Sequence, residues 1–240
     1  ETGLALVFPR FDADALSLVN PARPLSMAQR RDIIRQIASA LAYLHDECGI
    51  VHRDVKLENI LVRFTTTTTS DCNSISSSNN SNSNSPCDPR TATTPPSTPE
   101  PTPTHLPTAA RIHAVLADFG LSHRVSDPAP LKRGSPAYLS PETFLATTAT
   151  PTDTRAVDCF ALGVVMYALY MHAMPFPGGD RREMWSAIAL GRWTRPRPDQ
   201  LGGREALDVL EGLLARRPGD RWTAARVLRS PWLASSADCL

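Results

Sequence analysis

Apolar residues recur at helical spacing in the stretch between Ser26 and Gly49. They follow the 3, 4 and 7 intervals that place side chains on one face of an α-helix, at Ile33, Ile34, Ile37, Ala38, Leu41 and Leu44. Ser26 is a residue type that commonly caps a helix N-terminus. The pattern therefore predicts a helix that begins near Ser26 and ends near Cys48 and Gly49.

Shorter apolar runs predict β-strands. The run 4–8 is ended by Pro9, and the runs 49–51 and 60–62 enclose a polar segment that they would hold open as a hairpin-like frame. Another run, 112–117, leads into a second polar turn. A brief helix is predicted for Asp12 to Val19.

The second half of the chain is mainly helical in pattern. A long, mostly apolar helix is predicted from Asp153 to Tyr170, followed by amphipathic helices over 181–190 and 204–214 and one short helix over 221–233 that closes on Trp232. The apolar stretch 159–174 is short for a bilayer span and contains His172, so we interpret it as a core helix. All four tryptophans are expected in the core, and the fold class is α+β, mainly α.

Composition changes abruptly over residues 65–110, which are rich in Thr, Ser, Asn and Pro and begin with five consecutive threonines. Such a segment buries too little apolar surface to offset its ordering entropy, so it is predicted to be a disordered insertion. The flanking strands can still pair, because each doubling of loop length costs roughly 0.6 kcal/mol. Its Thr-Pro dipeptides could be phosphorylation sites or part of a Pro-rich segment that binds regulatory partners, although a spacer is the simpler interpretation.

Charge and cysteine content limit the classes of partner and the cellular locations that are expected. Twenty-five basic against twenty-four acidic residues give a formal charge of +1, which supplies no electrostatic reason for a nucleic-acid or membrane partner. The five cysteines are scattered, which favours reduced thiols and an intracellular location, cytoplasmic or nuclear. No secretory signal is recognisable at the start. No histidines stand at metal-ligand spacing, so His45 is expected to be an ordinary packed or surface residue.

Three polar motifs follow one another along the chain. The first runs from His52 to Asn59 and reads His-Arg-Asp-Val-Lys-Leu-Glu-Asn; the others are Asp-Phe-Gly at 118–120 and Ser-Pro-Glu at 140–142. In this order they resemble the signature set of protein kinases. The resemblance covers nearly all of the chain apart from the insertion. It corresponds to the hinge and large lobe of a serine/threonine kinase, with short β-hairpins around the catalytic loop, closest to the AMP-activated and calmodulin-dependent branch.

The resemblance implies roles for residues in this sequence. Asp54 would accept or orient the proton of a substrate hydroxyl, and Lys56 would hold the transferring phosphate. Asn59 and Asp118 would supply oxygen ligands to magnesium, a cation that prefers such donors. The implied cofactors are ATP and Mg²⁺, and the implied substrates are proteins phosphorylated on Ser or Thr.

Further residues are implied to bind the nucleotide or to support the loop. The adenine pocket would be formed by Phe8, Pro9, Phe11, Leu61 and Ala117. The activation segment would place Gly134, Ser135 and Pro136 near the catalytic loop, with Ser135 bonding toward Asp54 and Lys56. Structural support would come from a stacked His52 and Phe119, a phosphate-gripping Arg53, a loop-anchoring Asp158, and a buried bridge between Glu142 and Arg221.

One part of the kinase pattern is absent from these 240 residues. They contain no Gly-x-Gly-x-x-Gly segment, and their only lysines are Lys56 and Lys132, so the small lobe is expected to be missing. Apolar surface is then predicted to be exposed around Phe8 and Phe119. Two functions stay open at this point: an active kinase, and a kinase-like scaffold that binds a partner without transferring phosphate.

Overall fold

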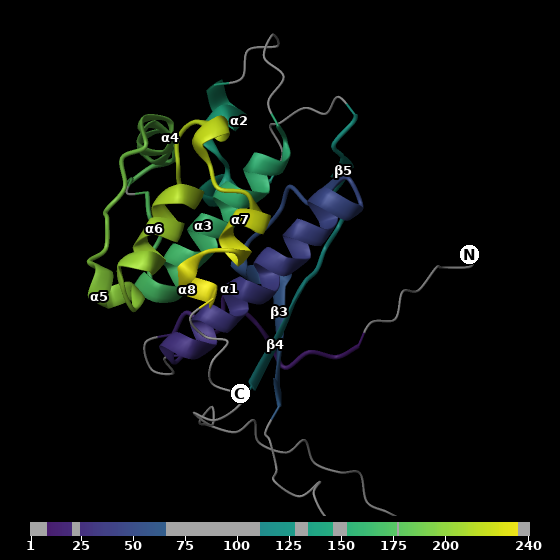
Figure 1. Ribbon diagram of the computed structural model, residues 1–240. Coiled ribbons are helices and arrows are strands. Elements are labelled where there is room, and N and C mark those ends of the chain that lie inside the picture. Colours follow the sequence, from purple (N-terminus) through teal and green to yellow (C-terminus); the bar gives the residue numbers. More distant parts are fainter. Residues whose placement is uncertain are drawn as a thin grey trace, which may run out of the picture.

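The computed structural model describes residues 9–20, 25–65, 111–127, 134–145, 153–176 and 178–234 (Figure 1). The predicted strand 4–8, Phe8 and nearly all of the predicted insertion lie outside these ranges. Within the described residues, helices pack around one core, and the strands lie along one side of it. None of the described helices is both long enough and apolar enough to cross a bilayer.

The strands are β1 (Ala13–Asp14), β2 (Ile50–Val51), β3 (Ile60–Thr65), β4 (Arg111–Leu116) and β5 (His123–Arg124). The helices are α1 (Met27–Ala42), α2 (Pro141–Leu145), α3 (Arg155–Met171), α4 (Arg181–Leu190), α5 (Pro198–Leu201), α6 (Arg204–Leu213), α7 (Ala224–Leu228) and α8 (Pro231–Ala234). Short 3-10 turns add η2 (Leu57–Asn59), η3 (Pro136–Tyr138) and η4 (Pro218–Asp220).

Helix α1 forms where the apolar spacing predicts it. The Ser26 side chain accepts a hydrogen bond from the Gln29 backbone N–H (3.1 Å), and the Gln29 side chain accepts one from the Ser26 N–H (2.9 Å), which is a complete capping box. The helix continues as a π-helical turn over Tyr43–Glu47 and stops before Gly49, whose φ of 63° suits glycine. The expected start and end are confirmed.

Helix α3 is the centre of the core. Nearly every residue from Ala156 to Tyr170 is buried, and Figure 1 shows the helix running behind α1 and beside α6. Gly163 permits this close packing, because a Cβ there would lie 2.9 Å from side-chain carbons of Leu213 and Leu214. The apolar pattern therefore produced a buried helix at the predicted place.

Strands β3 and β4 pair antiparallel from Ile60 opposite Leu116 to Thr65 opposite Arg111. Their pairing across the long intervening segment confirms the expectation that these runs could meet. The hairpin-like frame around the polar segment was wrong, because β2 pairs with β5 while β3 lies between β1 and β4. The prediction of a brief helix at 12–19 was also wrong. Ala13 and Asp14 form a strand that pairs with Val62 and Leu61, and turns follow it.

The C-terminal helices α4 and α6 match their predicted ranges. The single helix expected over 221–233 is instead two, α7 and α8. Thr223 caps α7 through its side chain, and Pro231 opens α8 because proline lacks the N–H that continuing one helix would need. The four- and five-residue helices α5 and α2 were not anticipated.

Candidate active site

The loop between β2 and β3 brings Asp54, Lys56 and Asn59 into direct contact. Asp54 Oδ2 accepts hydrogen bonds from Lys56 Nζ (2.8 Å) and Asn59 Nδ2 (3.0 Å). Asn59 Nδ2 also donates to the Asp54 backbone carbonyl (2.9 Å). The amide nitrogen of Asn59 therefore faces Asp54, and its amide oxygen points away from it. Two of these side chains are buried, and Lys56 is half-buried.

Ser135 joins this cluster from a segment 81 residues after Asp54 in the sequence. Its hydroxyl donates to Asp54 Oδ1 (3.0 Å) and accepts from Lys56 Nζ (3.2 Å). The structure thus places Ser135 against Asp54 and Lys56, as the resemblance implied. Asp54 Oδ1 accepts this one hydrogen bond among the described residues, and a carboxylate oxygen can accept two.

These contacts set the charge state of the pair. Burial by itself raises the pKa of Asp54, but hydrogen bonds from Lys56, Ser135 and Asn59 and the charge of Lys56 outweigh it, so the pKa is lowered. The hydrogen bond to Asp54 raises the pKa of Lys56 against a smaller opposing effect of burial, with help from the charges of Asp54, Glu58 and Asp118. At neutral pH the site therefore holds a carboxylate and an ammonium.

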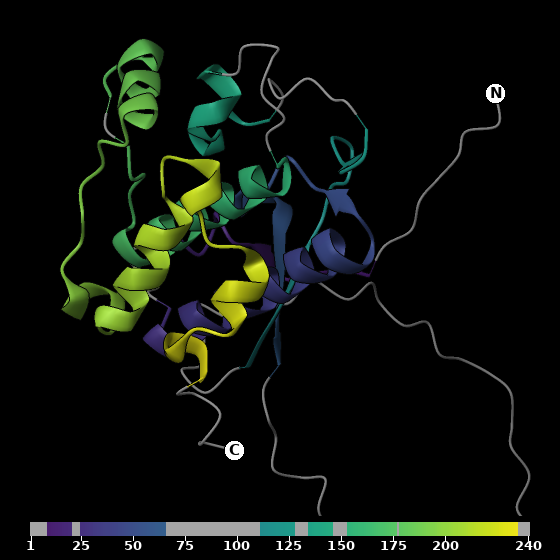
Figure 2. The same cartoon turned by 45° about the horizontal axis from the view of Figure 1, so that its top comes forward.

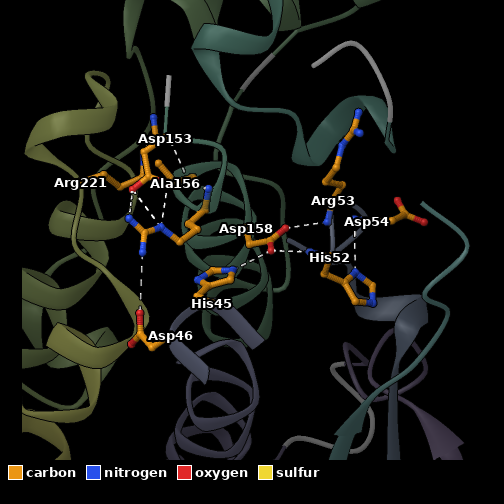
Figure 3. A network of polar contacts seen from close by, with 10 residues as sticks. His45, Asp46, His52, Arg53, Asp54, Asp153, Ala156, Asp158 and Arg221 are labelled. Carbon is orange, nitrogen blue, oxygen red and sulfur yellow. Dashed lines mark hydrogen bonds and ion pairs between the residues drawn. The ribbon is translucent and has the colours of Figure 1, made fainter. Parts of the chain in front are cut away.

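Asp158 fixes the backbone that presents Asp54. Its Oδ2 accepts from the His52 N–H (2.7 Å) and its Oδ1 from the Arg53 N–H (2.7 Å), as Figure 3 shows. The residue is 1% exposed. Arg53 has a positive φ of 69°, a conformation that costs a non-glycine residue about 1–3 kcal/mol. The two hydrogen bonds that His52 and Arg53 donate to Asp158 help hold that strained backbone in place.

His45 is a site residue that sequence reasoning missed. It is buried, and its Nε2 lies 2.8 Å from Asp158 Oδ2 (Figure 3). The available signal was its position four residues after Leu41 on the apolar face of the helix, where a polar ring needs a buried partner. Its expected role as an ordinary packed residue was therefore incomplete.

The Asp-Phe-Gly turn lies directly after β4. Asp118 has a positive φ of 62°, and its Oδ1 accepts from the Gly120 N–H (3.1 Å). The rings of His52 and Phe119 stack edge-to-face with centroids 4.9 Å apart, as implied. Phe119 is 46% exposed, which confirms the predicted apolar exposure at this residue; Phe8 lies outside the described part of the chain.

Gly134 lets the activation segment approach the catalytic loop. Its φ is 124°, and a Cβ at this position would lie 2.8 Å from the Arg53 carbonyl oxygen. Only glycine combines this backbone with that approach. It is followed by Ser135 and by Pro136, which opens η3. The structure therefore brings the three predicted activation-segment residues to the loop that carries Asp54.

Glu142 and Arg221 form the predicted buried bridge. Arg221 donates to Glu142 Oε1 (2.6 Å) and Oε2 (2.9 Å), a bidentate arrangement. The same guanidinium donates to the carbonyls of Ala156 (2.8 Å) and Ala215 (3.0 Å) and lies over the Phe160 ring. Its charge is therefore paired and its donors are largely satisfied.

The predicted nucleotide-pocket residues are brought together in part. Leu61 on β3 lies opposite Val115, and the Ala117 N–H donates to the Asn59 carbonyl (2.8 Å), so Leu61 and Ala117 lie near one another across the ladder. The Ala117 carbonyl in turn contacts His52 Nε2 (3.0 Å). Pro9 is exposed and Phe11 lies beneath the Arg63 guanidinium, both on the segment that enters β1.

The residues present suit a magnesium ion held together with phosphate. Magnesium is usually bound by one or two protein carboxylates or amides, while phosphates and water complete its six oxygens. Asp118 is exposed, and the Asn59 amide nitrogen donates to Asp54, so the Asn59 amide oxygen is the atom of that side chain that could bind a cation. The described residues contain no cluster of three or more His, Cys, Asp or Glu that could hold a metal by themselves.

Comparison with known proteins agrees with this geometry. The family model of the protein kinase domain matches residues 2–83 and 108–233, and the chain belongs to this family. It is 30% identical to a probable myosin light chain kinase of Dictyostelium discoideum over 84% of the chain and 51% of the relative. It is 28% identical to a calcium/calmodulin-dependent protein kinase type II of Caenorhabditis elegans over 88% of the chain and 23% of the relative.

A third relative, the mouse NUAK family SNF1-like kinase 1, is 28% identical over 92% of the chain and 26% of its own length. The relatives thus include calmodulin-dependent and SNF1-like kinases, which confirms the resemblance that the motifs indicated. The chain spans about half the length or less of these curated relatives. ATP and magnesium are typical cofactors of the family as a whole.

Proposed function

We propose that this domain transfers the γ-phosphate of ATP to Ser or Thr hydroxyls of protein substrates. The observation that carries the proposal is the Asp54 carboxylate. It is held ionised by Lys56, Asn59 and Ser135, and among the described residues Oδ1 accepts the bond from Ser135 alone, which leaves it one acceptor position. A substrate hydroxyl that donates to this position would have its oxygen oriented for attack.

The other residues of the cluster act on position and charge. Lys56 neutralises Asp54 in the resting site and presents a cation where a transferring phosphate would develop charge. Mg-ATP, when bound, supplies the phosphoryl group and the charge neutralisation that Asn59 and Asp118 would help to hold. Ser135 links the activation segment to the catalytic carboxylate, so movement of that segment would disturb Asp54 directly.

A protein substrate has room beside this cluster. A surface groove of about 570 Å³ runs from the activation segment to the start of α4 and is lined by Glu58, Ser135, Pro136, Ala137, Tyr138, Gly178, Gly179, Asp180, Arg181 and Met184. Tyr138 and Glu58 meet across it at 3.5 Å. An extended peptide segment that lay in this groove would bring its hydroxyl to the edge of the site.

The test is transfer of labelled γ-phosphate to Ser- and Thr-containing peptides by the natural protein that contains this sequence. Replacing Asp54→Asn should lower the rate by about 10²- to 10⁴-fold, the usual contribution of a positioned general base. An Asp208→Asn variant is the matched control, because Asp208 is an exposed partner of Arg204 far from the loop in sequence. Equal rates for the two variants would contradict the assignment.

The alternative is a kinase-like scaffold, which rests on the absence from these 240 residues of a Gly-x-Gly-x-x-Gly segment and of a lysine besides Lys56 and Lys132 that could serve as the strand lysine of a small lobe. It predicts no transfer by the unmodified protein and no change in Mg-ATP binding on Asp118→Asn. A measurable rate that falls in the Asp54→Asn variant excludes it.

A further inference from the structure

A second groove lies along α4, on the side of Gly178 and Gly179 away from the activation segment. It has a volume of about 660 Å³ and is lined by Gly178, Gly179, Arg182, Glu183, Ser186, Ala187 and Arg192; we refer to it as the α4 groove. Figures 1 and 2 show α4 at the outer end of the molecule beside α2, the helix against which it packs. The groove is separate from the residues that surround Asp54.

The segment around this groove is basic. Residues 181–197 contain five arginines and one glutamate, a local excess of four positive charges in a chain whose formal net charge is +1. Such an excess on one exposed element attracts anionic groups over roughly a Debye length. Asp180, which caps α4, and the carboxylate partners of Arg195 and Arg197 offset part of this excess. The positive charge that lines the groove is therefore carried by Arg182 and Arg192.

The arginines of this region differ in how they are paired. Arg195 bonds Glu211 (3.0 Å) and Arg197 bonds Asp199 (3.1 Å). Arg182 and Arg192 are exposed and line the groove, yet neither has a carboxylate within ion-pair distance among the described residues. The pairing thus leaves unneutralised guanidinium groups at the groove.

The geometry of α4 and the turn after it brings Arg182, Ser186 and Arg192 to the same side of the groove. Arg182 and Ser186 are four residues apart and therefore share one face of α4. Gly191 ends the helix with a φ of 64°, and the chain then turns back so that an Arg192 nitrogen lies 3.5 Å from Ser186 Oγ. Two guanidinium groups and a hydroxyl accordingly line one wall of the groove.

Glu183 is the one acidic residue that lines the groove. Its Oε2 accepts a hydrogen bond from the Gly179 N–H (2.8 Å), which commits one oxygen to the protein. The charge of Glu183 lowers the net positive charge that an anion meets in the groove. The volume of the groove also suits several side chains of a peptide better than one compact ion.

We propose that the α4 groove binds an acidic, Asp- or Glu-rich segment of a partner protein, with Arg182 and Arg192 as its carboxylate-binding residues. This binding goes beyond the proposed function, since it requires neither nucleotide nor the catalytic loop. Because the α4 groove and the groove beside Ser135 share Gly178 and Gly179, a substrate protein could occupy both.

The test uses fluorescence anisotropy with a labelled synthetic peptide of alternating Glu and Gly, added to the chain without ATP or magnesium. The double variant Arg182→Gln/Arg192→Gln should weaken binding by about three- to thirtyfold, as expected for loss of two exposed charge pairs. The matched control is Arg197→Gln/Arg204→Gln, which removes the same charge from exposed arginines that are paired with Asp199 and Asp208.

The outcomes are distinct. Loss in the groove variant with little change in the control supports the proposal. Equal loss in both variants, or equal binding of a Gln/Gly peptide, overturns it, because the attraction would then be general or unrelated to charge. Tighter binding of a phosphoserine/Gly peptide than of the Glu/Gly peptide overturns the choice of carboxylate.

A photo-crosslinking Glu/Gly peptide tests the same site on the unmodified chain, so the proposal does not depend on the folding of any variant. Crosslinks within 178–192 support it, and crosslinks confined to other segments contradict it. Phosphate transfer plays no part in either measurement, and the proposed function could therefore fail while this binding stands.

Discussion

Two clusters of charged side chains in the described part of the chain differ in how completely their hydrogen-bonding groups are paired. Around Arg221, both oxygens of Glu142 are paired, backbone carbonyls take the remaining donors, and the arginine side chain is fully buried. Around Asp54, one oxygen accepts a single hydrogen bond from the described residues, and Lys56 is half-buried. The groups around Arg221 are paired with one another, whereas Asp54 could accept one more hydrogen bond, which the proposed function assigns to a substrate hydroxyl.

The largest effect is expected from removing one partner of the closed cluster. Arg221→Ala leaves the Glu142 carboxylate buried without its cation, which should lower the free energy of unfolding by about 3–5 kcal/mol. The measurement is urea unfolding followed by circular dichroism. Arg204→Ala is the matched control, because its bridge to Asp208 is exposed and should contribute about 1 kcal/mol or less.

A second variant separates the penalty of an orphaned charge from the net value of the bridge. Replacing both partners, Glu142→Leu with Arg221→Met, should recover much of the lost stability, since a buried ion pair often equals an apolar pair of similar volume. If Arg221→Ala costs no more than Arg204→Ala, the cluster is not the closed structural element described above.

A smaller effect is expected at Asp158, whose carboxylate binds the backbone next to Asp54. Asp158→Asn keeps the shape but turns an amide N–H toward a backbone or histidine donor, so one buried group loses its partner. The free energy of unfolding should fall by about 1–3 kcal/mol. Asp32→Asn on the surface of α1, where Asp32 bonds Arg35 and Gln36, should change it by well under half of that amount.

The same variant should also lower any phosphate-transfer rate, because the backbone of Arg53 would lose the acceptor that holds its positive φ. An unchanged rate together with an unchanged unfolding energy would show that Asp158 does not position the loop.

Much of this architecture follows from local pattern. The capping residue Ser26 and the apolar face of α1 define that helix from sequence alone, and the nearly continuous apolar run defines α3. The pairing of β2 with β5 does not follow, because two-residue strands carry no alternation that specifies a partner. The splitting of the last helix depends on Pro231, which lacks the N–H that one continuous helix would need.

Some residues of the candidate site could likewise be predicted from the sequence, and others could not. Asp54, Lys56, Asn59 and Asp118 could be identified because their types and order are specific to a reaction class. His45 could not be placed, because its partner Asp158 is 113 residues away and only the packing of α1 against α3 brings the two together. The contact between Ser135 and Asp54 came from the family resemblance, since no local pattern encodes a separation of 81 residues.

The smallest expected effect concerns the pH dependence of the open cluster. The folded-state pKa of Asp54 is lowered, so the carboxylate contributes stability above its unfolded pKa and loses that contribution as pH falls through the folded value. The difference in free energy of unfolding between the unmodified chain and Asp54→Asn should be constant from about pH 7 to 5 and should shrink below about pH 4. Urea unfolding at successive pH values measures it. A difference that grows on acidification would mean that Lys56, Asn59 and Ser135 do not favour the ionised form, and Asp54 would then lack the charge that the proposed reaction requires.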